Sequence, residues 1–321
     1  MGRSHIPAAL AAALACAGPA AADDCLNPDA LGTARTLAVD PAVFERVGTM
    51  QYGGTLPLRP GEIVLTFDDG PMLPMTASVL RSLGEECVRA TFFVVGRQAR
   101  AHPAVVRRIA EEGHSIANHS ENHHLTALHG SHGVQELDKG FASIRAALEP
   151  AGVEPAPFFR FPGLLNTHAV ESHAKAKKVS VMSADFLADD WTGIRPEYII
   201  ARGLARLREK GSGIFLLHDV QPSLALALPK LLRELKARGY HIVHIVPAPG
   251  AGAPPPPLAE PLVAEKKAAP PPARRVAARP AAKEPEPTEL LPLARWRKMF
   301  EQQNQRAVTA VAYPGNENGG H

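Results

Sequence analysis

The feature that most constrains the fold of this chain is a regular alternation of short apolar stretches with amphipathic stretches between Gly61 and Val246. Parallel strands need a long crossover between them, usually a helix, so this alternation predicts an α/β fold with a parallel sheet. Seven strands are predicted, at Ile63–Phe67, Ala90–Val95, His114–Asn118, Phe158–Phe161, Val179–Ser183, Gly213–Leu217 and His241–Val246.

Six helices are expected between these strands, and glycines follow several of them, as is common at helix C-termini. They are predicted near Met75–Glu85, Arg97–Glu112, Val134–Leu148, Thr167–Lys177, Glu197–Lys210 and Leu224–Arg238. An open doubly wound sheet and a closed barrel both fit this pattern. In both, functional groups are expected where the strands end, at their carboxyl termini.

Residues 1–22 have the layout of a signal peptide. Arg3 and His5 precede a short apolar run, which is followed by three alanines at Ala20–Ala22 that form a cleavage signal. A membrane-spanning helix would need about 18 or more apolar residues, and this run is shorter. We therefore expect an exported protein, on the periplasmic or cell-wall side; a disordered Ala-rich start is the alternative.

The rest of the chain divides into four predicted regions. Residues 23–60 form an N-terminal lead-in, and residues 61–246 form the α/β domain. Residues 247–288 are dense in Pro and Ala, which is typical of a disordered linker. Residues 289–321 include a short stretch with helical spacing of apolar residues and basic neighbours. It is either an amphipathic helix that contacts a membrane or the cell wall, or a marginal helix without function.

Charge and cysteine content exclude some classes of function. The net charge of +3 over 321 residues, with no block of like charges, does not favour a nucleic-acid partner. Cys16 would leave with the signal peptide, and Cys25 and Cys87 would remain. In an oxidising compartment these two residues form either a disulfide or two free thiols.

Ionisable residues gather where five of the predicted strands end, a pattern that core packing does not explain. They are Asp68 and Asp69 after the first strand, His119 and His123 after the third, Arg160 at the fourth, Asp185–Asp190 after the fifth, and His218 and Asp219 after the sixth.

The two histidines at 119 and 123 are four residues apart, so a helical turn would place both imidazoles on one face. With a carboxylate from another strand they would form a two-His, one-carboxylate metal site. A His-rich surface loop is the alternative, because His114, His124, His129 and His132 lie nearby in the sequence. In extended backbone, Asp68 and Asp69 would point to opposite sides, which suggests different tasks.

Five short motifs occur in order: TFDDGP at 66–71, HSENH at 119–123, an Arg-x-Pro strand end at 160–162, Asp-Trp at 190–191 and LLH at 216–218. Over about residues 61–246 the chain resembles the polysaccharide deacetylase family (NodB homology domain, carbohydrate esterase family 4). The resemblance implies a distorted (β/α)7 barrel, which agrees with the seven predicted strands.

The same resemblance implies roles for individual residues. Asp69, His119 and His123 would bind a divalent metal, usually zinc, and Asp68 would be the general base. Arg160 would orient Asp68, and His218 would be the general acid, tuned by Asp190. Trp191 would help wall the substrate groove, Ser120 would support the metal loop, and a backbone N–H near Gly163 would stabilise an oxyanion.

The resemblance implies a zinc-dependent enzyme that hydrolyses N-acetyl groups of GlcNAc-containing glycans, such as peptidoglycan, poly-N-acetylglucosamine or chitooligosaccharides. Hydrolysis of O-acetyl esters on the same barrel is the alternative, and a glycan-binding module without turnover is a more distant one. We expect a monomer whose partner is the glycan.

The sequence departs from the family at two places. Gly163 stands where many members carry Tyr or Trp, and the segment from Asp185 to Trp191 is longer than the family's Asp-x-x-Asp-Trp. For the remaining strand-end acids, Asp185, Asp189 and Asp219, we expect solvated or helix-capping roles.

Overall fold

A computed structural model describes residue 25, residues 27–124 and residues 128–249 of the chain. Ten strands form one sheet, in which every described pairing is parallel. The strands are β1 (Thr33–Val39), β2 (Arg46–Val47), β3 (Glu62–Asp68), β4 (Thr91–Val94), β5 (Ser115–Asn118), β6 (Phe158–Phe159), β7 (Ser180–Met182), β8 (Phe186–Leu187), β9 (Gly213–His218) and β10 (His241–Pro247).

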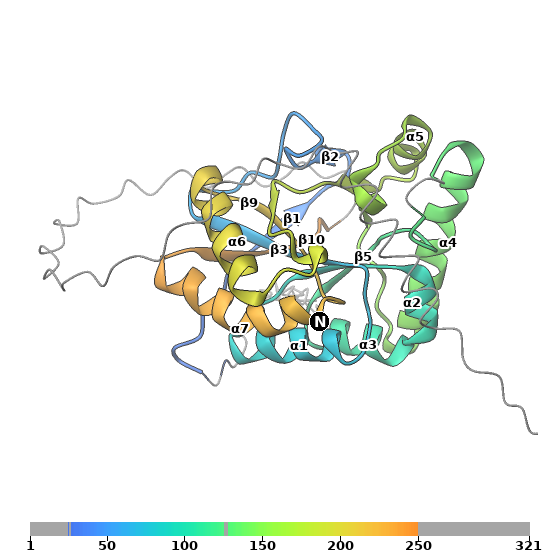
Figure 1. Cartoon of the computed structure of the whole chain (residues 1–321). Coiled ribbons are helices and arrows are strands. Elements are labelled where there is room, and N and C mark those ends of the chain that lie inside the picture. Colours follow the sequence, from blue (N-terminus) through green and yellow to red (C-terminus); the bar gives the residue numbers. More distant parts are fainter. Residues whose placement is uncertain (1–24, 26, 125–127, 250–321) are drawn as a thin grey trace, which may run out of the picture.

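The sheet curls into a distorted (β/α) barrel with its helices on the outside (Figure 1). Around the barrel the paired strands follow the order β8, β9, β3, β4, β5, β6, β7 and β2. The helices are α1 (Met75–Glu85), α2 (Gly96–Ala101), α3 (Pro103–Glu111), α4 (Gly130–Leu148), α5 (His168–Ala176), α6 (Pro196–Lys210) and α7 (Pro222–Ala237). Three short 3-10 helices are η1 (Glu149–Ala151), η2 (Pro162–Leu164) and η3 (Asp190–Thr192).

All seven predicted strands are present, and the structure adds three. The segment before residue 61, predicted as a lead-in, contributes β1 and β2 to the sheet, and β8 follows β7. The single helix predicted over residues 97–112 is wrong, because it is split into α2 and α3 at His102. His102 has φ −133 and ψ 53 and precedes Pro103. A proline ring clashes with the preceding residue when that residue is helical, so the helical conformation is disfavoured at His102.

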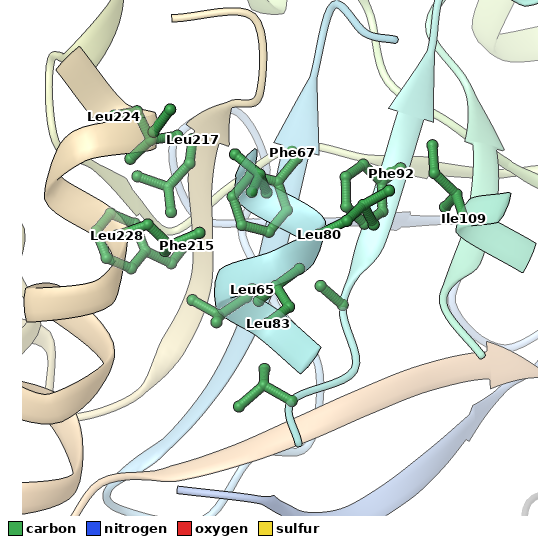
Figure 2. Packing of buried hydrophobic residues seen from close by; sticks show 14 of the residues in the cluster. Leu65, Phe67, Leu80, Leu83, Phe92, Ile109, Phe215, Leu217, Leu224 and Leu228 are labelled. Atoms are coloured by element: carbon green, nitrogen blue, oxygen red, sulfur yellow. The ribbon is translucent and has the colours of Figure 1, made fainter. Parts of the chain in front are cut away.

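Alternation along β3 decides which side chains face the helices and which face the barrel interior. Ile63, Leu65 and Phe67 pack outward in the large cluster that includes residues of α1 and α7. Figure 2 shows this packing, with Phe67 and Leu65 beside Leu80 and Leu83. The intervening residues point inward because successive side chains of a strand alternate, so Asp68 ends the strand on the interior side.

The pair of strands β1 and β10 closes the end of the barrel at which the other strands begin. β10 pairs with the start of β3 through His241 and Ile242. Ile245 lies three residues after Ile242, and its carbonyl oxygen accepts a hydrogen bond from the hydroxyl of Ser115, the first residue of β5 (2.7 Å). The inner cluster includes Val243 and Ile245 together with Phe93 and Phe158. The barrel is therefore packed at this end, and its opposite end remains available for a site.

The N-terminal segment is also held covalently. Cys25 and Cys87 form a disulfide, so the disulfide, not the pair of free thiols, is present in the structure. In the described ranges, no helix has the length and apolar character needed to cross a membrane. The predicted signal peptide and C-terminal helix lie outside the described residues, and so does the predicted linker from residue 250 onward. The linker's first residue, Pro247, is the last residue of β10.

Candidate active site

The two aspartates at the end of β3 differ in backbone conformation as well as in position. Asp68 is the last residue of the strand and is buried. Asp69 has a φ of 78, in the left-handed region, so the chain leaves the strand direction at this residue. The predicted extended geometry for the pair is therefore wrong. The turn at Asp69, not strand alternation, gives the two carboxylates different surroundings.

Asp69 lies beside the two histidines that follow β5. Its Oδ1 is 3.0 Å from Nε2 of His123 and 3.4 Å from Nε2 of His119. One ligand atom from each of these residues lies within 4.8 Å of the others, the spacing expected of groups that share one metal ion. The three predicted metal ligands thus come together in the structure.

The histidines are not carried on a helical turn, contrary to the sequence prediction. Ser120 and His123 both have a positive φ, 65 and 59, and the segment between them is an irregular bend. The hydroxyl of Ser120 accepts a hydrogen bond from the backbone N–H of His123 (2.9 Å). Ser120 therefore supports the loop, as the resemblance implied, but the spacing of the histidines had suggested the wrong local geometry.

The donor set fits a divalent cation. The Nδ1–H of His119 donates to the carbonyl oxygen of Arg160 (2.9 Å), so Nε2 is the ring nitrogen that faces Asp69. Burial opposes ionisation of Asp69, but the neighbouring imidazoles of His123 and His119 outweigh it and hold the pKa of this carboxyl well below the usual range. Burial also lowers the pKa of His123, although Asp69 opposes this effect. An ionised carboxylate and a neutral imidazole are the forms that bind metal.

Arg160 holds Asp68 from inside the barrel. Its Nη1 donates to Oδ1 of Asp68 (2.7 Å) and to the hydroxyl of Thr66 (2.8 Å). Its Nε and Nη2 donate to the carbonyl oxygens of Met182 and Ser183, and the guanidinium lies 4.0 Å from the centre of the Phe93 ring. Arg160 is fully buried, so the predicted contact between it and Asp68 is present and rigidly supported.

His218 ends β9 on the interior side and is held by Asp190. The Nδ1–H of His218 donates to Oδ1 of Asp190 (3.0 Å), and its backbone N–H donates to Oδ2 (2.7 Å). Burial favours the neutral imidazole, but the charge and hydrogen bond of Asp190 outweigh it and raise the pKa of His218 to about 9. Among the acids of the segment 185–190, Asp190 is therefore the partner of His218.

A small pocket opens over these groups. Apolar side chains cover one side of it, and Gly163, with a φ of 60, contributes backbone. Trp191 lies edge-on to His218, with 5.6 Å between the ring centres. The pocket is lined by Asp68, His119, His123, Phe161, Gly163, Leu164, Leu187, Trp191, Leu216 and His218.

Comparison with known proteins agrees with this arrangement. The sequence model described as polysaccharide deacetylase matches residues 56–182. A peptidoglycan-N-acetylglucosamine deacetylase of Bacillus cereus is 33% identical over 189 residues, which cover 57% of this chain and 85% of that protein. The chain belongs to the polysaccharide deacetylase family.

Other members of the polysaccharide deacetylase family match over similar lengths. A chitooligosaccharide deacetylase of Sinorhizobium fredii is 34% identical over 56% of this chain and 88% of that protein. Some curated relatives are longer, because the match spans 66% of another Bacillus cereus enzyme and 38% of one from Listeria monocytogenes. Among solved structures, a peptidoglycan deacetylase of Bdellovibrio bacteriovorus superposes with a TM-score of 0.60 at 31% identity. That match covers 67% of this chain and 59% of the other.

Three acids near the family's site motifs do not have the solvated or capping roles expected from the sequence. Asp185 is buried and accepts hydrogen bonds from Thr49, Thr55 and the N–H of Ile214. Asp189 forms ion pairs with two arginines of α6, and its side chain caps no helix.

Asp219 is the third of these acids and is fully buried. Burial raises its pKa to about 7, although a hydrogen bond from Thr76 to Oδ2 (2.5 Å) opposes the shift. The distant partners of Asp185 and Asp219, such as Thr49 and Thr76, gave no signal in the sequence.

The apolar side of the pocket was not predicted from the sequence. Leu187, Trp191 and Leu216 form a small cluster of buried residues, against which the half-buried Leu164 packs. Only Trp191 among them was a predicted site residue. Their positions in the sequence could have indicated them, because Leu187 and Leu216 lie near the carboxyl ends of β8 and β9, where the other pocket residues also lie.

Proposed function

We propose that the protein is a metal-dependent hydrolase that removes N-acetyl groups from GlcNAc-containing glycans, yielding acetate and a free amine. The observation that carries this proposal is the convergence of Asp69, His119 and His123 beside two further ionisable groups, Asp68 and His218, in one apolar-walled pocket. The names of the relatives, which are peptidoglycan and chitooligosaccharide deacetylases, support the same substrate class.

Asp69, His119 and His123 would hold the metal, and we propose Zn²⁺ because two imidazoles and one carboxylate with an open position suit this ion. Such an ion, when bound, lowers the pKa of water and polarises a carbonyl oxygen. The positions of the ligands are set by the protein through the Arg160 carbonyl, which holds the ring of His119, and through Ser120, which holds the loop of His123.

Asp68 acts as the general base in this proposal. It lines the pocket, and its Oδ2 is 3.8 Å from Nε2 of His119, so its free oxygen lies on the metal side. Arg160 occupies Oδ1 and prevents the carboxylate from rotating. Asp68 therefore accepts the proton of the water that attacks the amide carbon, and general-base catalysis of this kind contributes about 10²- to 10⁴-fold in rate.

His218 acts as the general acid. An amine leaves an amide only after its nitrogen is protonated, so the acid must carry a proton at the working pH. The raised pKa of His218, about 9, keeps its imidazole protonated at neutral pH. Asp190 occupies Nδ1, so the proton available to the departing amine is the one on Nε2.

The apolar side of the pocket fits the methyl group of an acetyl substituent. Leu164, Leu187 and Trp191 are large apolar side chains in the pocket lining, and Leu216 lies beside them. We propose the backbone N–H of Gly163 as a donor to the oxyanion that forms at the carbonyl carbon, because Gly163 lies in the pocket lining.

We further propose that the protein acts outside the cytoplasm, in the periplasm or on the cell-wall side. The signal-peptide layout of residues 1–22 supports this location. The Cys25–Cys87 disulfide supports it as well, because disulfides persist mainly in oxidising compartments.

The test is acetate release by the purified protein, residues 23–321, from peptidoglycan, poly-N-acetylglucosamine and chitooligosaccharides. We expect release that a chelator abolishes and that added Zn²⁺ restores. An O-acetylated xylan in the same panel separates amide hydrolysis from ester hydrolysis. Acetate release from the xylan alone would contradict the proposal, and so would undiminished release by an Asp69→Ala variant that binds no metal.

A further inference from the structure

The segment after β2 lies beside the site although it comes from the part of the chain that precedes the domain motifs. We call residues 48–55 the strap. It begins at Gly48, which has a φ of 105. A Cβ at this position would lie 2.6 Å from the carbonyl carbon of Ser183 and 2.7 Å from the nitrogen of Ala184, so only glycine allows this approach. The strap is thus pressed against the connection between β7 and β8.

One anchor of the strap is the buried carboxylate of Asp185. Thr49 donates to Oδ1 through its backbone N–H and its hydroxyl, both at 2.8 Å, and Thr55 donates to Oδ2 at 2.6 Å. The backbone N–H of Met50 also donates to the carbonyl oxygen of Ala184 (2.9 Å). These bonds attach both ends of the strap to the segment that leads directly into β8 and therefore to Leu187 of the pocket.

The second anchor is on the other side of the pocket. The side-chain amide of Gln51 donates to the carbonyl oxygen of Leu164 (2.5 Å) and to Oδ1 of Asn166 (3.3 Å). The hydroxyl of Tyr52 donates to Glu171 (2.8 Å), whose Oε1 also accepts a bond from Asn166 (2.9 Å). The strap therefore holds the loop that contributes Leu164 to the pocket.

Leu164 needs such support because its backbone is in an unfavourable conformation. It has a φ of 54, and the preceding Gly163 has a φ of 60. A residue with a branched side chain is uncommon in the left-handed region and stays there only when its surroundings hold it. The side-chain amide of Gln51 donates a hydrogen bond to the carbonyl oxygen of Leu164, the strained residue itself.

We infer that Gln51 is a positioning residue that fixes Leu164 against Leu187 and Trp191 and so limits the site to short acyl groups. This inference rests on the proposed function for the identity of the acyl group. Gln51 does not line the pocket, and it acts through its hydrogen bonds to the Leu164 carbonyl and to Asn166 in the same loop. Without this bond the loop at 163–166 relaxes, and the space between Leu164 and Leu187 accommodates additional methylene groups.

The test measures selectivity, which does not depend on how much of the protein is folded. Chitooligosaccharides carrying N-acetyl, N-propionyl or N-butyryl groups are hydrolysed by the wild-type protein and by Gln51→Ala. For Gln51→Ala we expect the ratio of kcat/KM for butyryl over acetyl substrate to rise about tenfold or more, since the two acyl groups differ by two methylenes and one methylene in an apolar pocket accounts for about 10- to 200-fold discrimination. Gln51→Glu keeps the length of the side chain but lacks the donor, so its ratio should rise in the same way.

A binding series provides a second readout that needs no turnover. The affinities of the Zn²⁺-loaded protein for acetate, propionate and butyrate are measured by calorimetry, and the butyrate-to-acetate ratio should rise in both Gln51 variants. Gln135→Ala, which changes an exposed glutamine of α4, is the matched control and should leave both ratios unchanged.

The outcomes separate the inference from the proposed function. If the wild-type protein releases no acyl group, the proposed function fails and the carboxylate series alone decides the role of Gln51. Unchanged butyrate-to-acetate ratios in folded Gln51→Ala would overturn the inference, whether or not acetate is released.

Discussion

The two ends of β5 each hold a buried histidine, and their surroundings are opposite. His114 precedes the strand, and its Nδ1 accepts a hydrogen bond from the backbone N–H of Ala90 (3.1 Å). Burial, together with the charges of His244 and Arg89, lowers the pKa of His114 to about 3. His119 follows the strand, and its Nε2 lies 3.4 Å from Oδ1 of Asp69.

The comparison extends to the neighbours of these two histidines. His244 is buried beside Ser115 at the start of β5, and burial with the charge of Arg89 lowers its pKa to about 4. His218, at the end where strands finish, has a pKa raised to about 9 because Asp190 outweighs the effect of burial. The carboxylate nearest to His114, that of Glu112, is 4.0 Å from its Nε2 and does not offset burial, so this histidine stays neutral in the core. The hydrogen-bonded carboxylate of Asp190 does offset burial and makes His218 available for proton transfer.

The largest difference between the two ends of β5 is expected when one histidine is removed from each end. His119→Ala should lose stoichiometric Zn²⁺ and reduce acetate release on the order of 10³-fold or more, because the metal supplies several kcal/mol of transition-state stabilisation. His114→Ala should keep metal and activity but lose about 2 kcal/mol of stability, since the Ala90 N–H loses its acceptor. Metal analysis and urea unfolding distinguish the two. Full metal occupancy in His119→Ala would contradict the assignment.

Removal of the disulfide tests whether the end of the barrel at which the strands begin contributes to stability alone. Cys87 precedes β4 as His114 precedes β5, and it is linked to Cys25 across 62 residues of sequence. Replacing both cysteines with serine should lower the free energy of unfolding by about 4 kcal/mol, from the loop-closure entropy of the unfolded chain. The kcat/KM measured well below the unfolding transition should not change. A loss of activity in the folded double variant would show that the two ends are coupled.

The Asp190→Asn variant removes the carboxylate that is hydrogen-bonded to His218, so this buried histidine should behave more like His114. Its pKa should fall from about 9 to about 6.5 or lower, so the protonated fraction at pH 8 drops about 30-fold. The ratio of wild-type to variant kcat should therefore be small at pH 6 and approach 30 at pH 8. A ratio that does not change with pH would mean that Asp190 supports structure only.

A further expected effect is the acid sensitivity of the histidines at the start of β5. Because the pKa values of His114 and His244 are below the unfolded value of about 6.5, their contribution to stability is complete above pH 6.5. It is lost as the pH falls toward 4. Each histidine should contribute up to about 1.4 kcal/mol per pH unit to this loss. Urea unfolding at pH 6.5, 5.5 and 4.5 should show a shallower dependence in His244→Gln; an unchanged slope would count against this origin.

The main elements of the fold and the polar part of the site could be predicted from the sequence, because both depend on local patterns. Strands such as Ile63–Phe67 are continuous apolar runs, and the groups that follow them must meet at one end of a parallel barrel. By contrast, β2 and β8 have two residues each, too few for any periodicity to be recognised. β6 is as short, but Phe158 and Phe159 begin a longer apolar stretch that could be recognised.

What could not be predicted depends on partners far away in the sequence. Asp185 and Asp219 resemble solvent-exposed acids in the sequence, yet Thr49 and Thr76, more than 100 residues away, are bonded to them in the interior. The positive φ angles of Asp69 and His123 likewise follow from the loops that converge on the site, since neither residue type requires that conformation.

The closure of the barrel by β1 and β10 has a consequence for the order of folding. Leu37 pairs with Ile245, so strands from the two extremes of the described chain are hydrogen-bonded neighbours. Contacts of such long sequence separation form late, since the entropy of closing the intervening loop is lost before the contact stabilises anything. The inner cluster around Val243 and Phe93 therefore completes only after the last strand has been synthesised, and earlier intermediates expose that apolar surface.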